Sequence, residues 1–110
     1  MRFRPIKNWV IARVAITKMT GTIVSPNATS KTTRFYLLES ISPEAEKAGF
    51  KVGELWMARQ VYDIFLHGGA FHRVTFSIDE AICIAEDAKL SDFVDVHGKP
   101  LDEVLAREAA

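Results

Sequence analysis

A long polar segment between two strand-like patterns is the feature that most constrains this chain of 110 residues. It runs from Thr17 to Arg34, is rich in threonine and serine, and shows no sustained period of two or 3.6. Before it, Trp9–Ile16 is rich in β-branched residues and has Arg13 as its only charged residue, which predicts a strand covered on both faces. After it, Thr32–Ile41 is again extended. The sequence therefore predicts a long loop, at about residues 17–31, between two strands.

This loop carries one bulky apolar pair, Ile23 and Val24, in otherwise polar surroundings. An apolar pair displayed on a polar loop is typical of a segment that docks on a partner. The same pair would also suit a buried strand of a β-barrel, and the pattern alone leaves both interpretations open.

Turn residues along the rest of the chain divide it into many short strands. Ser42 and Pro43 are expected to begin a short helical turn that ends at Gly49. Apolar residues at helical spacing predict a helix within Lys99–Ala110. Further strands are expected at Leu55–Gln60, Val61–Leu66, Phe71–Phe76, Ala81–Ala85 and Leu90–Val96, with His67-Gly68-Gly69 as a hairpin turn. The predicted fold is a small all-β barrel over residues 1–96 with a helical extension at 97–110.

Composition narrows the function classes. Hydrophobic residues make up 48% of the chain, which suffices for a packed core. The formal net charge is zero, with 14 basic and 14 acidic residues, which disfavours binding to a nucleic-acid backbone. The single cysteine, Cys83, cannot form an internal disulfide, and no segment resembles a membrane span or a signal peptide. We therefore expect a cytoplasmic protein.

The chain shows no pattern typical of catalysis. Asp79 and Glu80 are adjacent and would point to opposite faces of a strand. No common metal-ligand spacing relates its candidate ligands, His67, His72 and Cys83. We therefore expect no enzyme activity, no metal and no cofactor. The large aromatic residues are expected in the core, at Trp9, Trp56, Phe65, Phe71 and Phe76.

Several short motifs, in order, resemble the co-chaperonins of the GroES type. They are Phe3-Arg4-Pro5-Ile6, Gly21-Thr22-Ile23-Val24-Ser25, Lys31-Thr32-Thr33-Arg34, Lys51-Val52-Gly53-Glu54 and Glu80-Ala81-Ile82-Cys83-Ile84. The resemblance spans roughly residues 2 to 96. The chain departs from the family at Ser25, where a third aliphatic residue is usual, and in its C-terminal helix. Its segment Ala48–Leu55 is more similar to the co-chaperonins that bacteriophages encode.

The resemblance implies a homo-heptameric ring that caps a GroEL-type, ATP-dependent chaperonin and encloses an unfolded client, such as a viral capsid protein. It implies chaperonin contacts at Gly21, Thr22, Ile23, Val24 and Ser25. It also implies that the first strand of one subunit pairs with the last strand of its neighbour, through Phe3, Arg4, Pro5, Ile6, Phe93, Val94 and Val96.

Two other function classes remain open. A ring-forming structural or decoration protein of a virion would also suit a small barrel with a protruding loop. An OB-like nucleic-acid binder is disfavoured by the zero net charge, and by aromatic residues that are not interleaved with basic ones. A dehydrogenase is not expected, because these residues include no nucleotide-binding half.

Overall fold

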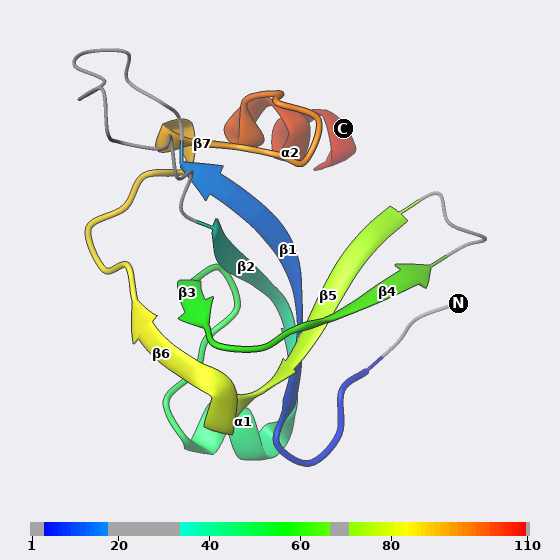
Figure 1. Cartoon of the computed structure of the whole chain (residues 1–110), viewed down its shortest axis with the longest axis vertical. Coiled ribbons are helices and arrows are strands. Elements are labelled where there is room, and N and C mark those ends of the chain that lie inside the picture. The colour runs from blue at the N-terminus through cyan, green and yellow to red at the C-terminus, as the bar shows by residue number, and fades with distance from the viewer. Residues whose placement is uncertain (1–3, 18–33, 67–70, 110) are drawn as a thin grey trace, which may run out of the picture.

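The computed structural model describes residues 4–17, 34–66 and 71–109, and most of its elements are β-strands. The strands form one seven-stranded antiparallel sheet that curls around a core (Figure 1). Their bounds are Trp9–Thr17 (β1), Arg34–Ile41 (β2), Leu55–Ala58 (β3), Tyr62–Leu66 (β4), Phe71–Ser77 (β5), Ala81–Ile84 (β6) and Phe93–Val94 (β7). The predicted small all-β class is confirmed.

The strand order is β4-β5-β1-β2-β3-β6, and β7 pairs with the last residues of β1. Within the described residues, the end strands β4 and β6 each pair with one strand only, so the barrel is irregular and partly open. The helices are α1 (Pro43–Lys47) and α2 (Leu101–Ala109), with short 3-10 turns at Ile78–Glu80 (η1) and Leu90–Asp92 (η2). The helices α1 and α2 lie at opposite ends of the molecule (Figure 1).

The short helix α1 has a defined start and end. At its start, the Ser42 hydroxyl accepts a hydrogen bond from the Ala45 N–H at 3.1 Å, as an N-cap does. At its end, Gly49 has a φ of 101°, a conformation that glycine adopts without strain. The Phe50 and Gly49 N–H groups donate back to the carbonyls of Ala45 and Glu46, which is the Schellman pattern. These bonds explain why the predicted helical turn forms where its serine, proline and glycine indicate.

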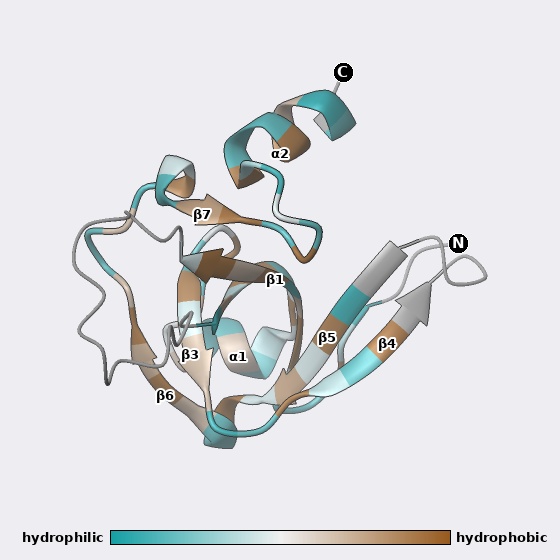
Figure 2. Ribbon diagram, turned by 45° about the horizontal axis from the view of Figure 1, so that its top comes forward, coloured by the Kyte–Doolittle hydropathy of each residue, from teal (hydrophilic) through white to brown (hydrophobic). Residues whose placement is uncertain are grey.

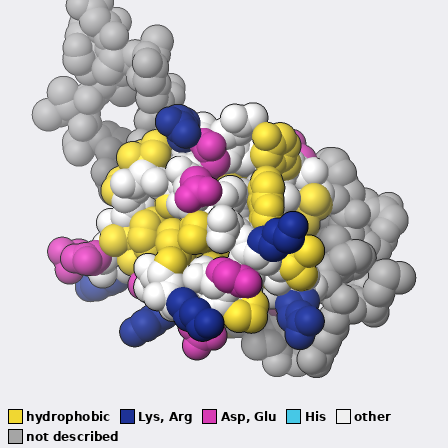
Figure 3. Space-filling view, turned by 90° about the horizontal axis from the view of Figure 1, so that it is seen from below, with side chains coloured by type: hydrophobic (Ala, Val, Ile, Leu, Met, Phe, Trp, Pro, Cys, Tyr) yellow, Lys and Arg dark blue, Asp and Glu magenta, His cyan; other side chains and the backbone are white. Residues whose placement is uncertain are grey.

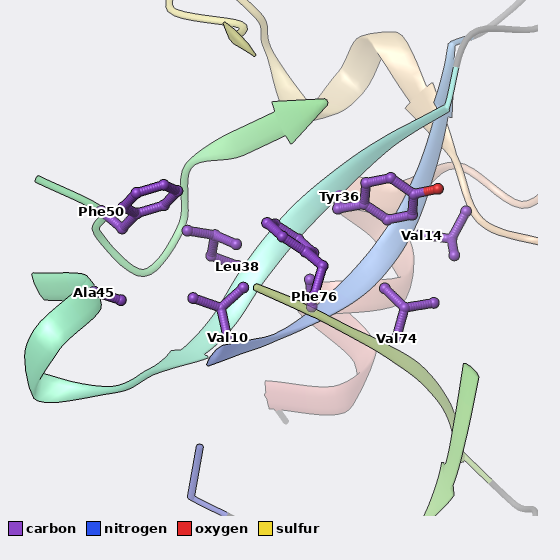
Figure 4. Close-up of a cluster of buried hydrophobic side chains, with 9 residues drawn as sticks. Val10, Val14, Tyr36, Leu38, Ala45, Phe50, Val74 and Phe76 are labelled. Carbon is purple, nitrogen blue, oxygen red and sulfur yellow. The ribbon is translucent and has the colours of Figure 1, made fainter. Parts of the chain in front are cut away.

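Strand β1 separates two apolar cores. Its residues Val10, Ala12 and Val14 face the larger core, which is centred on the fully buried Phe76 (Figure 4). Its residue Ala15 faces the smaller core on the other side. The members of that core are Ala15, Leu37, Leu55, Phe93 and Leu101. The prediction that both faces of this strand are covered is confirmed, and β1 is mostly apolar, with Arg13 as its one charged residue (Figure 2).

Several predicted elements differ in extent, most of them by one or two residues. The strand expected at Leu90–Val96 is only Phe93–Val94, because Leu90–Asp92 coils into η2 and the Asp95 carboxylate accepts hydrogen bonds from the N–H groups of His97 and Lys99. Thr17, which was expected in the loop, is the last residue of β1, because it pairs with Phe93. The strand expected at Leu55–Gln60 ends at Ala58.

Two side-chain predictions are wrong, and others are confirmed or stay open. Trp9 is exposed, because it lies at the first position of β1, outside the core. Asp79 and Glu80 lie in the η1 turn and not in a strand. Phe76 is buried as expected, and Trp56 is half-buried against the same core. The side chains of Phe65 and Phe71 lie outside the described part.

Candidate functional site

Two adjacent strand ends flank segment 18–33, the predicted long loop, and form what we call the loop base. Strand β1 ends at Thr17 and β2 begins at Arg34, and Ile16 is the register partner of Arg34. The two ends of segment 18–33 therefore leave the sheet from adjacent strands. Residues Gly21, Thr22, Ile23, Val24 and Ser25, the predicted chaperonin contacts, lie in this segment, outside the described residues.

Strand β7 braces this loop base from the other side. Val94 is the register partner of Ile16, and Phe93 is the partner of Thr17. The Phe93 ring is buried and meets Phe35 of β2 edge-on, with ring centroids 5.7 Å apart and planes at 82°. The strand that leads into the loop is thus held between β2 and β7.

An ionic cluster holds α2 over the outer face of the sheet. Arg13 of β1 donates a hydrogen bond to Glu108 of α2, and its Nε lies 3.5 Å from an oxygen of Glu39 in β2. Arg73 of β5 forms an ion pair with the same Glu39 oxygen. The cluster joins β1, β2, β5 and α2. Two positive and two negative side chains meet, so the buried charge is balanced.

The pKa of Arg13 reflects two opposed effects. Burial lowers the pKa of its guanidinium, whereas the Glu108 and Glu39 carboxylates raise it, and the net change is upward from the ordinary value. Arg13 therefore stays charged at any ordinary pH. This cluster escaped the sequence analysis, although its signal was visible as the single charge in an otherwise apolar strand.

The N-terminal turn is the second region with predicted site residues. Three hydrogen bonds fix it: the Trp9 N–H donates to Ile6, the Ile78 N–H donates to Asn8, and the buried Ser42 hydroxyl donates to the Lys7 carbonyl. Lys7 has a φ of 53°, the left-handed region that a lysine rarely adopts. A turn that keeps such a residue is firmly held by its surroundings.

This turn presents apolar side chains to solvent. Ile6 is 62% exposed, and Trp9, at 36%, lies against Tyr62 of β4 with ring centroids 6.0 Å apart. On the face opposite α2, exposed apolar side chains are interspersed with charged ones (Figure 3). Individual exposed apolar residues are normal on a protein surface, but a rigid turn that carries two of them is a candidate contact surface.

The remaining predicted interface residues differ in accessibility. Arg4 and Ile6 are exposed and Pro5 is buried, whereas Phe3 lies outside the described residues. Val96 is 41% exposed. Phe93 and Val94 are used within the chain: Phe93 is buried in the smaller core, and Val94 pairs with Ile16 on one side and forms a bridge to Pro100 on the other. The structure places the N-terminal turn and β7 at different ends of the molecule (Figure 1).

Strand β6, like β4, is an end strand of the sheet in which no interface residue was predicted. Within the described residues it pairs with β3 alone, and Ile82 has no register partner there, because a bulge sets Met57 opposite Cys83 and Ala58 opposite Ala81. The bulge breaks the alternation of the strand, so that Ile82 and Cys83, two consecutive residues, are both exposed.

An exposed ion pair lies beside this edge. Arg59 Nε donates to a Glu80 carboxylate oxygen at 2.9 Å. This hydrogen bond lowers the pKa of Glu80 and raises the pKa of Arg59.

In a scan of family models and a search of curated proteins, the chain matches none. Within the described residues, no group of three or more His, Cys, Asp or Glu side chains is arranged to hold a metal ion. No helix among those residues is both long and apolar enough to cross a membrane. The surfaces that the described residues offer for contact are the loop base, the N-terminal turn and the β6 edge.

Proposed function

We propose that this chain is a non-enzymatic co-chaperonin, whose subunits form a ring that caps a GroEL-type chaperonin through segment 18–33. The observation that carries the proposal is the loop base. Strands β1 and β2 are paired up to the point where the segment leaves the sheet, and β7 braces β1 from the other side. A polar segment with an apolar pair is thus attached to a rigid support, which suits docking to a partner.

The energetics of such a contact favour a ring. Burial of Ile23 and Val24 in an apolar groove would contribute about 3–5 kcal/mol of transfer free energy. Ordering the loop costs roughly 1–2 kcal/mol for each residue fixed. One loop therefore binds weakly and reversibly. Several loops on one ring bind tightly together, because each later contact forms at a high effective concentration.

The ring itself, seven-fold in the family that the chain resembles, is part of the proposal. The N-terminal turn and strand β7, which the family resemblance would join between neighbouring subunits, are two different surfaces of one chain. A contact between two different surfaces repeats head to tail. A head-to-tail contact closes into a ring when its rotation fits. An unfolded protein, such as a viral capsid protein, is the proposed client inside the cap.

The test replaces Val24 with aspartate and measures co-migration with a GroEL-type chaperonin in the presence of ATP. We expect wild-type protein to co-migrate with seven-fold stoichiometry by native mass, and Val24→Asp protein to migrate alone. The matched control is Val52→Asp, because Val52 is an exposed valine in a turn outside the loop. It should bind as the wild type does.

Two outcomes would contradict the proposal. If Val24→Asp protein still co-migrates with the chaperonin, the apolar pair is not the anchor. If wild-type protein forms a ring that binds no chaperonin, the virion structural role becomes the better explanation.

A further inference from the structure

We propose that residues 90–109 are a strap that opens and closes on the sheet as one unit, with the ion pair between Glu108 and Arg13 as its latch. The strap consists of η2, β7 and α2. When closed, it braces β1 at the point where segment 18–33 leaves the sheet, and when open it removes that brace. The inference goes beyond the proposed function, because it concerns a motion of the chain alone.

The first argument is that the strap can leave without disturbing the larger core. In the part of the chain that the structure describes, the members of that core and the residues packed against it end at Ala81. The strap contributes Phe93 and Leu101 to the smaller core, whose other buried members belong to β1, β2 and β3. Opening therefore dismantles the smaller core and leaves the larger one closed, as a local unfolding unit does.

The second argument is that a short backbone pairing joins the strap to the sheet. Strand β7 pairs with β1 through Phe93 and Val94 only. The elements that α2 approaches most extensively are η2 and β7, which precede it in the chain, and a bridge from Val94 to Pro100 ties β7 to the start of α2. All three elements lie at the end of the molecule where β1 ends (Figure 1). Because α2 rests on its own chain neighbours, it leaves the sheet together with β7.

The third argument is that one face of α2 carries both an apolar anchor and the latch. Leu101, Leu105 and Glu108 follow one another at spacings of four and three, which places them on the same side of a helix. Leu101 is fully buried in the smaller core, and Leu105 packs against that core. At the far end of this face, Glu108 accepts a hydrogen bond from Arg13. A carboxylate thus ends an otherwise apolar stripe, opposite the one charged residue of β1.

Arg13 depends on Glu108 for part of its neutralisation. Among the described residues, the Arg13 Nε has no hydrogen-bond partner, and it lies 3.5 Å from a Glu39 oxygen that also pairs with Arg73. When α2 leaves, two arginines and one glutamate remain in the cluster, so its charge is no longer balanced. The Glu108 side chain is 41% exposed, so water reaches the latch. An ion pair that is open to water breaks at modest cost and is weakened by salt.

The helix does not favour the closed state by itself. It has nine residues, and isolated helices shorter than about 12–15 residues are marginal in water. Glu108 lies in its last turn, where a negative charge opposes the helix dipole. Glu108 therefore destabilises the isolated helix and stabilises only the docked one, through Arg13.

Opening reaches the loop base through β1. Ile16 and Thr17 would lose their partners Val94 and Phe93, while Ile16 would keep its partner in β2. Segment 18–33 would then leave the sheet from a strand end that is held on one side only. The coupling is reciprocal: a partner that binds this segment more tightly on a braced base would also favour the closed strap.

Amide hydrogen exchange of the full chain tests the strap, with wild type compared to Glu108→Gln. We expect the amides of residues 104–109 to exchange about tenfold faster in the variant, the low-end effect of losing a hydrogen bond to a charged group. The amides of Ile16 and Thr17 should accelerate by the same factor, because they open with the strap. The amide of Val74, in the larger core, should exchange as it does in the wild type.

The matched control is Glu103→Gln, which removes the same charge from an exposed position in the first turn of α2. Without a latch there, exchange should change by no more than about threefold, the scale of a helix-dipole effect. Salt gives a second readout. Raising the sodium chloride concentration should accelerate exchange of residues 104–109 in the wild type and have no such effect in Glu108→Gln protein.

Three results would overturn the inference. Unchanged or slower exchange of α2 in Glu108→Gln protein would mean that the helix dipole, and not the latch, governs this residue. Equal acceleration of all amides, that of Val74 included, would mean that residues 90–109 unfold only with the whole molecule. Acceleration in α2 without any change at Ile16 and Thr17 would break the coupling to the loop base. The chain is measured without a chaperonin, so these outcomes are independent of the Val24→Asp test.

Discussion

The buried ring of Phe93 joins β7 to the base of the loop, so its removal tests whether the smaller core stabilises that end of the molecule. Phe93 is 3% exposed and contacts Phe35, and it shares a cluster with Leu101 of α2. Truncation of a buried phenylalanine to alanine typically costs about 3–5 kcal/mol in unfolding free energy, as lost burial plus a residual cavity. We expect Phe93→Ala to fall in this range.

The measurement is urea denaturation followed by circular dichroism, with the slope m compared between variants. At roughly 4 °C or more per kcal/mol for a domain near this size, the melting temperature should also fall by at least about 12 °C. Phe93→Leu is the control, because it keeps an apolar side chain of similar volume and should cost less than about 1.5 kcal/mol.

Hydrogen exchange locates the effect. In Phe93→Ala protein the amides of β7 and α2 should lose protection first, whereas those next to Phe76 in the larger core should retain it. A loss below about 1 kcal/mol for Phe93→Ala would refute this reasoning. It would mean that β7 and α2 contribute little to the stability of the loop base.

Two further predictions concern charged residues. Arg13→Met should lower the unfolding free energy measured in urea titrations by about 3 kcal/mol. This is the low end of the range for a broken buried ion pair, because the partners Glu39 and Glu108 are partly exposed. An unchanged or higher stability would show that the cluster serves only to place α2. Arg59 lowers the pKa of Glu80, so their pairing stabilises the fold above the unfolded pKa of a glutamate, near 4.3, and this contribution is lost as the pH falls through the lower folded pKa. Thermal melts of wild type and Glu80→Gln should therefore differ at pH 7, and the difference should shrink as the pH falls below the unfolded value; a difference that grows in acid would contradict the assignment.

Elements that depend mainly on their own residues and their immediate neighbours in the chain were predictable from the sequence. The β-branched run of β1 forms the strand expected of it, and Ser42, Pro43 and Gly49 start and end α1 where their local chemistry favours it. The C-terminal helix follows from its apolar spacing. In each case neighbouring residues supply most of the information.

Features that depend on distant partners were not predictable. A single charged residue in an apolar strand marks Arg13 as unusual, but the sequence does not identify its partners. Glu39 and Glu108 come close to it only when the sheet and α2 have formed. The shortening of the last strand depends on the turn at Asp95, and the exposure of Ile82 depends on the bulge against β3. For the candidate site, Ile6 is exposed and Phe93 is buried in its own chain, and the subunit contacts expected of both stay a prediction.

The contact between Arg13 and Glu108 also has a consequence for the order in which the protein matures. These residues are 95 positions apart, and the smaller core needs Phe93 and Leu101 before it can close over β1. Synthesis delivers the N-terminal strands first, so the outer face of β1 stays uncovered until α2 has been made. The end of the molecule from which segment 18–33 leaves the sheet is therefore the last to become rigid. Under the proposed function, an incomplete chain would present this segment on a base that is not yet braced by β7.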